Sequence, residues 1–164
     1  MDVLWSPWRY DYIKADENQK KTDPVSCVFC EILKSSESDE EKFILHRAEF
    51  NFVILNIYPY ISGHLMIVPF KHLSALDQAE KDSSNELMDL TKDCQRILKD
   101  AYSPHGINIG MNLGKAAGAG VTEHYHMHLL PRWVGDANFM TAIGETRTIP
   151  ESLETTFDKL KTRF

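Results

Sequence analysis

Short apolar runs in the first half of the chain are typical of β-strands. Three runs rich in Phe, Val, Ile and Leu cover Lys42–His46, Asn51–Asn56 and His64–Val68, and Pro69 follows the third. The segment Tyr58–Gly63 carries the Pro, Ser and Gly residues of a turn. The pattern therefore predicts three strands in succession, of which the second and third are joined by that turn.

A helix is predicted next, because apolar residues recur at three- and four-residue intervals. Ser83 and Glu86 have the spacing of a capping box, so the helix is expected to begin there. One of its faces would pack on the sheet through Leu87, Leu90, Cys94, Ile97, Leu98 and Ala101. At this position Cys94 is expected to be a small packing residue.

Two further strands are predicted in the second half of the chain. They cover Ile107–Asn112 and Tyr125–Leu130, and Pro131 is expected to end the second one. A loop rich in Gly and Ala, Gly114–Gly120, lies between them. Because the five strands are short and most of the helix lies in the middle, the pattern favours an α+β fold with a mainly antiparallel five-stranded sheet.

A short C-terminal helix is predicted from apolar residues at helical spacing, Leu153, Phe157, Leu160 and Phe164. Thr148 and Glu151, on either side of Pro150, predict its start. We expect this helix and the tail to form a C-terminal segment at residues 146–164.

The rest of the chain divides into an N-terminal arm at residues 1–24 and a main domain at residues 25–145. The arm carries aromatic residues, and its Trp5 and Trp8 are expected to pack onto the domain. Residues 34–42 are polar and highly charged, which predicts a solvated loop. The 164 residues are enough for one domain that buries about two-thirds of its unfolded surface.

Charge and cysteine content exclude several classes of protein. The chain has 18 Lys and Arg against 24 Asp and Glu, a net charge of −6, which argues against non-specific binding to nucleic acids or anionic membranes. No apolar run approaches the roughly 20 residues of a membrane span, and the N-terminus does not resemble a signal peptide. Three cysteines are too few for a disulfide framework, so we expect a cytoplasmic protein.

Three histidines alternate with apolar residues at His124, His126 and His128. Residues two apart in a strand face the same side, so the three imidazoles would project together while the other side packs in the core. A face of three imidazoles lines a wet cleft, binds a metal, or carries out proton and nucleophile chemistry. The glycines of the preceding loop would let backbone N–H groups approach a phosphate, which suggests a phospho-histidine intermediate.

The segment from His124 to Leu130 matches the signature of the histidine triad (HIT) family, His-φ-His-φ-His-φ-φ with φ apolar, at every position. Asn56 and the stretch from Tyr58 to Pro69 resemble the ribose-side strand pair of that family, and Asn112–Gly120 resembles its phosphate loop. The main domain at 25–145 is therefore identified as a HIT domain. Leu4–Arg9 and Pro131–Phe139 resemble the bacterial branch related to diadenosine tetraphosphate phosphorylase, also called ATP adenylyltransferase.

The resemblance implies catalytic roles for three histidines. His126 would attack the α-phosphorus and form a covalent nucleotidyl-histidine, while its other ring nitrogen would donate a hydrogen bond, usually to a backbone carbonyl, that holds its tautomer. His128 and His64 would face the phosphate and bridging oxygens. From the residues alone, His64 could instead only satisfy a strand backbone. His46 and His105 match nothing in the motif and are expected to be surface or loop histidines.

The resemblance also implies a nucleotide-binding set. Asn56 would bind the ribose hydroxyls, although it could equally be a turn residue with an internal hydrogen bond. The phosphate would be held by Asn112 and by the loop residues Gly118, Ala119, Gly120 and Val121. Relatives often have a serine in this loop, but this chain has Gly120-Val121 instead. The contacts to the phosphate would therefore come from backbone N–H groups. Trp133 would either stack on the adenine or pack on the domain.

Cys27 and Cys30 form a Cys-x-x-Cys pair whose spacing suits two corners of a zinc tetrahedron, a redox pair, or two packed thiols. A zinc site would need two more ligands, and His72 and His124 are available. In the HIT family such residues bind a structural zinc, so the resemblance implies a closed site of Cys27, Cys30, His72 and His124. No cofactor would be needed for the chemistry itself.

The implied activity is nucleotidyl transfer or hydrolysis at the α-phosphate of a dinucleoside polyphosphate, with diadenosine tetraphosphate as the expected substrate. With inorganic phosphate as acceptor the enzyme would be a phosphorylase, and with water a hydrolase. The alternatives are a nucleoside phosphoramidate or AMP-lysine-type hydrolase, a nucleotide-binding regulatory protein with vestigial activity, and a zinc-dependent redox module. The resemblance further implies a homodimer joined through the sheets and the central helix.

Overall fold

The computed structural model describes residues 27–137, 139–144 and 149–164. Its five strands are β1 (Ile44–Arg47), β2 (Asn51–Leu55), β3 (Leu65–Pro69), β4 (Gly106–Gly110) and β5 (Met127–Arg132). Its α-helices are α2 (Val28–Lys34), α3 (Lys81–Tyr102), α4 (Phe139–Ala142) and α5 (Leu153–Lys161), and short 3-10 turns lie at Leu76–Gln78 and Lys115–Ala117. The arm at 1–24, with Trp5 and Trp8, lies outside the described residues.

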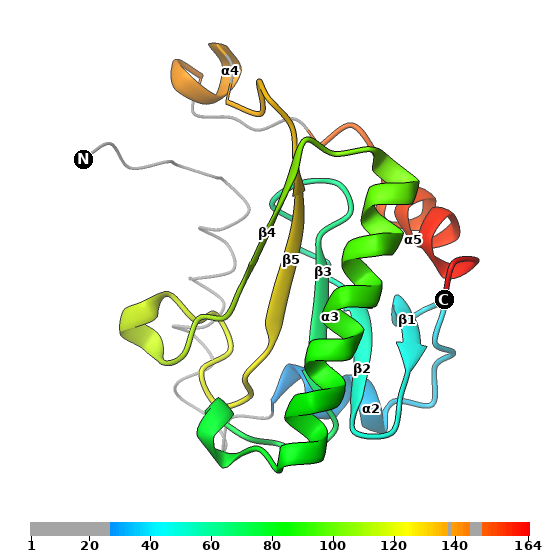
Figure 1. Cartoon of the computed structure of the whole chain (residues 1–164), viewed down its shortest axis with the longest axis vertical. Coiled ribbons are helices and arrows are strands. Elements are labelled where there is room, and N and C mark those ends of the chain that lie inside the picture. Colours follow the sequence, from blue (N-terminus) through cyan, green and yellow to red (C-terminus); the bar gives the residue numbers. More distant parts are fainter. Residues whose placement is uncertain (1–26, 138, 145–148) are drawn as a thin grey trace.

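The strands form one sheet in the order β1-β2-β3-β5-β4, in which every neighbouring pair is antiparallel. Figure 1 shows α3 lying across one face of this sheet with α5 beside it. The predicted α+β fold with an antiparallel five-stranded sheet, a central helix and a short C-terminal helix is therefore confirmed.

The strands β2 and β3 of the sheet are buried on both faces. Side chains that alternate along β2 divide into two clusters: Val53 and Leu55 pack with α3 and α5, whereas Phe52 and Ile54 pack with α2. All five residues of β2 and of β3 are consequently buried. Burying one large apolar side chain contributes about 1.5–3 kcal/mol, so continuous apolar runs in these strands stabilise both layers. The helix α2, which the sequence analysis did not predict, closes the second layer.

The start of α3 differs from the prediction. The helix begins at Lys81, and its N-cap residue Glu80 makes no side-chain cap, so the predicted capping box is wrong. The Glu86 carboxylate instead accepts hydrogen bonds from the backbone N–H groups of Glu49, Phe50 and Asn51 at 2.8–2.9 Å. Those N–H groups lie at the β1–β2 turn. Hydrogen bonds to a charged acceptor are stronger than those to a neutral one, so Glu86 stabilises the turn and does not cap its own helix. Cys94 is fully buried in the α3 cluster, as predicted.

The end of β5 also differs from the prediction, because Pro131 lies inside the strand. β3 pairs with β5 only from Met127 to Leu129, so at Pro131 the strand is bonded to β4 alone, through Ile107. A proline without an N–H group is tolerated where one side of a strand has no partner. The strand begins at Met127, and His124 and His126 precede it.

The C-terminal helix α5 is capped by Ser152, whose hydroxyl accepts the Thr155 N–H at 3.2 Å. The predicted start around Pro150 is therefore slightly early, and Thr148 lies outside the described residues. Lys161 ties the helix to the sheet, since its ammonium donates to the carbonyls of Ile44 and Leu45 at 3.2 and 2.8 Å.

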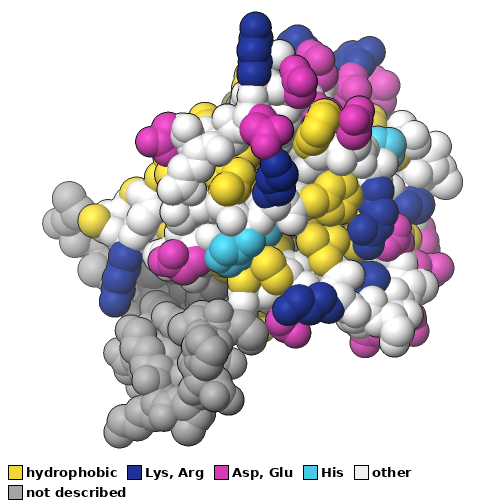
Figure 2. Space-filling view, turned by 90° about the horizontal axis from the view of Figure 1, so that it is seen from below, with side chains coloured by type: hydrophobic (Ala, Val, Ile, Leu, Met, Phe, Trp, Pro, Cys, Tyr) yellow, Lys and Arg dark blue, Asp and Glu magenta, His cyan; other side chains and the backbone are white. Residues whose placement is uncertain are grey.

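Charged side chains of both signs are mixed on the surface. Figure 2 shows acidic and basic groups alternating around small apolar patches. In the polar segment predicted over 34–42, Asp39 accepts three hydrogen bonds from the Arg47 guanidinium, at 2.8–3.1 Å, and most other residues are exposed. Among the described helices, none is both long and apolar enough to cross a membrane.

Candidate active site and metal centre

Four histidines are buried together on the α2 face of the sheet. His64 directly precedes β3, and His128 lies on β5 opposite Met66, a residue of the α2 cluster. His124 and His126 lead into β5 in the same alternation, and the rings of His126 and His128 are 4.7 Å apart. Each of the four is at most 8% exposed. The predicted common face of the triad is therefore present, although only its last histidine lies in the strand.

The ring of His126 is fixed in one tautomer. Its Nδ1 lies 3.0 Å from the backbone carbonyl of His124, and because a carbonyl can only accept, Nδ1 carries the proton. Burial lowers the pKa of His126, so the ring is neutral at pH 7 and Nε2 keeps its lone pair. The ring packs against Phe29, with centroids 5.2 Å apart. This is the arrangement that a nucleophilic imidazole needs.

His64 and His128 form a second oriented pair. The Tyr60 N–H donates to His64 Nδ1 at 3.2 Å, so the proton of His64 lies on Nε2 and is donated to His128 Nδ1 at 2.9 Å. The proton of His128 must then lie on Nε2. Burial, with the neighbouring histidines second, lowers the pKa of His64 to about 3 and that of His128 to about 4. Both rings are thus neutral at pH 7, and His128 presents an N–H donor.

Asn56 lies at the edge of this cluster. Its Nδ2 is 3.4 Å from His64 Nδ1, and its Oδ1 accepts the Tyr58 N–H at 2.9 Å. The bond from Tyr58 is the internal hydrogen bond that is expected if Asn56 is a turn residue. The same conformation leaves the amide group beside His64, so the two interpretations are compatible.

The Gly/Ala loop folds around a 3-10 turn with Gly114 and Gly118 at φ of 79° and 87°. The N–H groups of Gly118 and Ala119 donate within the loop, to Lys115 and Gly114, at 3.0 and 3.3 Å. Asn112 and Ala119 are half-buried and Gly118 and Gly120 exposed, while Val121 packs against the α2 cluster. The far end of the loop therefore lies against the histidine face, and its middle is exposed.

Trp133 follows β5 and packs edge-on against Tyr102 at the end of α3, with ring centroids 6.2 Å apart. Since α3 covers the sheet face opposite the histidines, this contact favours the packing interpretation of Trp133 over adenine stacking.

A second cluster brings together Cys27, Cys30, His72 and His124, whose ligand atoms all lie within 4.8 Å of one another. Cys27 Sγ is 3.3 Å from His124 Nδ1, and Cys30 Sγ is 3.3 Å from His72 Nδ1. His124 donates its Nε2 proton to the Pro69 carbonyl at 2.8 Å, so the Nδ1 lone pair faces the sulfurs. Both cysteines are free thiols, and burial together with Cys27 raises the pKa of Cys30. Two thiolates and two imidazoles suit a closed tetrahedral metal site.

The two clusters share residues. His124 supplies its ring to the metal-ligand set and its carbonyl to His126. Phe29, between the two cysteines, packs against both rings, with centroids 5.4 and 5.2 Å away. The sequence analysis did not identify Phe29 or Tyr60, whose ring lies 4.8 Å from that of His64. In the sequence, Phe29 was marked only by its position between the two cysteines, and Tyr60 only by its position in the Tyr58–Gly63 turn.

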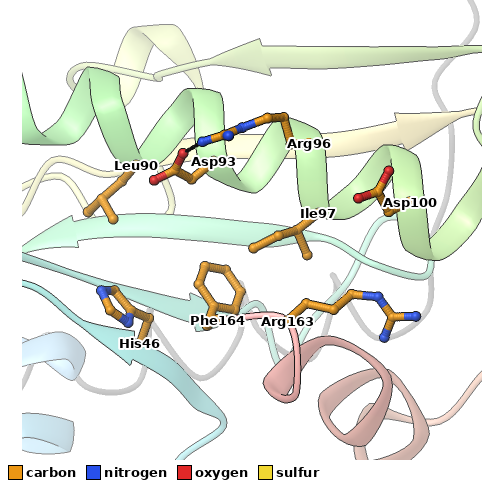
Figure 3. A pocket seen from close by; sticks show the side chains of 8 residues that line it. All are labelled: His46, Leu90, Asp93, Arg96, Ile97, Asp100, Arg163 and Phe164. Atoms are coloured by element: carbon orange, nitrogen blue, oxygen red, sulfur yellow. Dashed lines mark hydrogen bonds and ion pairs between the residues drawn. The ribbon is translucent and has the colours of Figure 1, made fainter.

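His46 and His105 lie outside both clusters, as expected. His46 stacks on Phe164, with centroids 5.7 Å apart, in a hollow of about 340 Å³ on the α3 side of the sheet (Figure 3). His105 directly precedes β4 and accepts a hydrogen bond at 2.9 Å from the N–H of Val134, which lies in the loop after β5.

Comparison with known proteins agrees with this geometry, since residues 37–134 match the HIT domain. The chain belongs to the HIT family. It is 42% identical over 166 residues to the AP-4-A phosphorylase of Mycobacterium tuberculosis, covering 98% of this chain and 83% of that protein. It is 30% identical over 109 residues to adenosine 5'-monophosphoramidase HNT1 of Saccharomyces cerevisiae, covering 66% and 63% of the two chains.

Among solved HIT structures, a zinc-bound histidine triad family protein from Mycobacterium smegmatis superposes with a TM-score of 0.68 at 26% identity, covering 84% of this chain and 92% of that one. The expectations of a HIT fold and of a HIT-family enzyme are confirmed by these matches. The roles of individual site residues stay predictions.

Proposed function

We propose that this protein cleaves dinucleoside polyphosphates, diadenosine tetraphosphate first among them, by nucleotidyl transfer through His126. The observation that carries the proposal is the fixed tautomer of His126, whose Nδ1–H is bound to the His124 carbonyl and whose Nε2 is left as the nucleophile. The name of the 42% identical relative supports the substrate class.

In the first step, His126 Nε2 forms a bond to the α-phosphorus while the bond to the bridging oxygen breaks. The bridging oxygen leaves with the electron pair, and the Nε2–H of His128 stabilises its charge by a hydrogen bond. The imidazole of His126 becomes a cation, which the carbonyl of His124 stabilises through Nδ1–H. His64 holds His128 in the tautomer that this step requires.

Binding residues follow from the same proposal. Asn56 would bind the ribose hydroxyls, and Asn112 with the N–H groups of Gly120 and Val121 would bind the α-phosphate. Gly118 and Ala119 would shape the loop, since their own N–H groups are used inside it. Each role is a proposal that rests on position.

We also propose that Cys27, Cys30, His72 and His124 hold a structural zinc ion. The mixed sulfur and nitrogen donor set supports zinc, as does the zinc-bound relative. With four protein ligands the ion would have no open position for a catalytic water. Its contribution would be to fix α2 against β5.

In the second step an acceptor attacks the nucleotidyl-histidine and releases His126. Inorganic phosphate would yield ADP from an adenylyl group, and water would yield AMP. We favour phosphate because of the phosphorylase relative. The yeast relative makes adenosine 5'-phosphoramidate the second substrate to test.

The test is incubation with diadenosine tetraphosphate with and without phosphate, followed by chromatographic separation of the nucleotides. We expect ADP and ATP only when phosphate is present, no product with His126→Ala, and normal rates with His105→Ala. Release of AMP without phosphate would overturn the phosphorylase assignment. No turnover of either substrate would overturn the enzymatic proposal as a whole.

A homodimer is proposed through β4, which has a neighbour on one side only within the described residues. Its Ile109 is 42% exposed, which a partner strand would cover. Sedimentation equilibrium should give twice the chain mass, and Ile109→Asp should give a monomer. A monomeric unsubstituted chain would overturn this assignment.

A further inference from the structure

The histidine face of the sheet extends beyond the triad. Along β5, residues two apart share a face, so Leu130 and Arg132 follow His128 on the same side. Across the ladder, β4 places Gly110 beside His128, Asn108 beside Leu130 and Gly106 beside Arg132. Figure 1 shows β4 at the edge of the sheet, next to β5.

This extension is open in the described part of the chain. Gly106, Asn108 and Gly110 are all exposed, and a Cβ built on either glycine would meet no atom within 4 Å. The α2 cluster that covers this face contains residues of β1, β2 and β3, and its buried members do not reach β4. The described residues therefore leave room for a substrate bound at His126 to continue over β4.

Arg132 stands at the end of this open strip, about 13 Å along the strand from His128 at 3.3 Å per residue. Its Nε donates to Asp136 Oδ2 at 2.6 Å, and its Nη1 donates to Asn108 Oδ1 at 3.0 Å. The Asp136 side chain is 11% exposed and that of Arg132 is 40% exposed. The guanidinium is thus held in place on one side and accessible on the other.

Arg132 and Asn108 both keep free N–H donors. A guanidinium has five N–H donors, of which these bonds use two. The Asn108 carbonyl oxygen must face Arg132, since Arg132 can only donate, so the Asn108 amide presents its NH2 group. One oxygen of Asp136, Oδ2, accepts from both Arg132 and the Trp133 N–H, and the Asp136 side chain is largely buried. Exposed guanidinium and amide N–H donors of this kind suit a phosphate group.

A polyphosphate needs such a group here. His64 and His128 are neutral at pH 7, and two thiolates cancel the charge of a zinc ion, so the residues around His126 bring no net positive charge. The chain as a whole has a net charge of −6. Arg132, which is paired with Asp136 on one side, offers exposed guanidinium N–H groups on the histidine face itself.

We propose that Arg132 and Asn108 bind a phosphate of the substrate beyond the α-phosphate, and so select dinucleoside polyphosphates over substrates with an α-phosphate alone. This inference rests on the proposed function, whose failure is recognised separately when the unsubstituted chain turns over no substrate. The chemically similar alternative is that inorganic phosphate, the acceptor, binds at Arg132.

The experiment compares two substrates on the full chain. Arg132→Gln should raise the KM for diadenosine tetraphosphate about 10- to 100-fold, the loss expected for charge-assisted hydrogen bonds. It should change kcat/KM for adenosine 5'-phosphoramidate less than about twofold, a change below 0.5 kcal/mol. Equal losses on both substrates, or none on either, would overturn the proposal. A rise confined to the KM for inorganic phosphate would assign Arg132 to the acceptor and would overturn it as well.

Two further variants separate binding from folding. Arg47→Gln is the matched control, since Arg47 lies on β1, away from the four buried histidines of the site, has a side chain that is 36% exposed and pairs with Asp39 at 2.8 Å. It should leave both substrates unaffected. Asp136→Asn keeps the Arg132 charge but loosens its position, so it should raise the KM for diadenosine tetraphosphate less than Arg132→Gln does. If Asp136→Asn raised it more, Arg132 would only hold the loop, and the phosphate role would be refuted.

Discussion

Replacing His64 by glutamine should make the folded chain less sensitive to acid. Burial holds the pKa of His64 near 3 and that of His128 near 4, against 6.5 for an ordinary histidine. Between those values the unfolded chain binds more protons than the folded chain, so stability falls as the pH falls below 6.5. Carboxylates with a lowered pKa also make the folded chain less stable in acid, but their effect begins only at a lower pH, near the ordinary pKa of a carboxyl group.

The magnitude follows from one pKa unit being worth about 1.36 kcal/mol. At pH 5.0, 1.5 units below the ordinary value, each buried histidine lowers the free energy of unfolding by about 2 kcal/mol. His64 and His128 together therefore remove about 4 kcal/mol between pH 7.5 and pH 5.0, a large part of the 5–15 kcal/mol that a typical domain has. His64→Gln should lose only about half as much over the same interval.

The assay is urea unfolding of both proteins at the two pH values, with the free energy extrapolated to water. Protonation of the metal ligands and of the carboxylates occurs in both proteins and cancels in the comparison. His105→Ala, which removes a loop histidine, should behave like the unsubstituted chain. Equal acid losses for the unsubstituted chain and His64→Gln would refute the inference that His64 is buried in its neutral form.

Three further changes test other parts of the structure. Glu86→Gln should lower the free energy of unfolding by about 1–3 kcal/mol in urea, because three N–H groups of the β1–β2 turn lose a charged acceptor. Gly63→Ala should cost at least about 1–2 kcal/mol in thermal unfolding, since Gly63 has φ of 77° and a Cβ would lie 3.0 Å from Tyr102. Cys30→Ser should lower bound zinc by metal analysis, the melting temperature and kcat together; retained zinc would contradict the ligand assignment.

The strands were predictable because their apolar runs are continuous, and continuous runs belong to strands buried on both faces. The helix α2 was not, since its seven residues are too few to show a period and it is stabilised by packing of Phe29 under the sheet. The capping box of Ser83 and Glu86 misled for a related reason. Glu86 has its partners 35 to 37 residues away in the chain, a distance at which local spacing carries no information.

The site was predictable where its residues alternate or repeat at fixed spacing, as in the triad and the two cysteines. A backbone carbonyl that orients His126 was expected only from the family resemblance, and the residues that supply the orienting groups could not be identified from the sequence, because these groups are backbone atoms. The carbonyls of Pro69 and His124 and the N–H group of Tyr60 determine which nitrogen of each histidine carries the proton. Any residue type can supply such atoms, so only the fold reveals them.

The shared position of His124 would give the proposed metal centre a role in catalysis that needs no metal-bound water. A carbonyl orients the His126 ring only as well as that carbonyl is itself fixed, and His124 is held by Pro69 on one ring nitrogen and by the sulfur cluster on the other. A helix as short as α2 is not stable alone, so a zinc ion joining Cys27 and Cys30 to His124 would supply the rigidity. Because that centre would be neutral, it cannot also attract a polyphosphate. Different residues would therefore serve the two purposes. The metal ligands would orient the nucleophile His126, and Arg132 at the open end of the histidine face would bind the phosphates of the substrate.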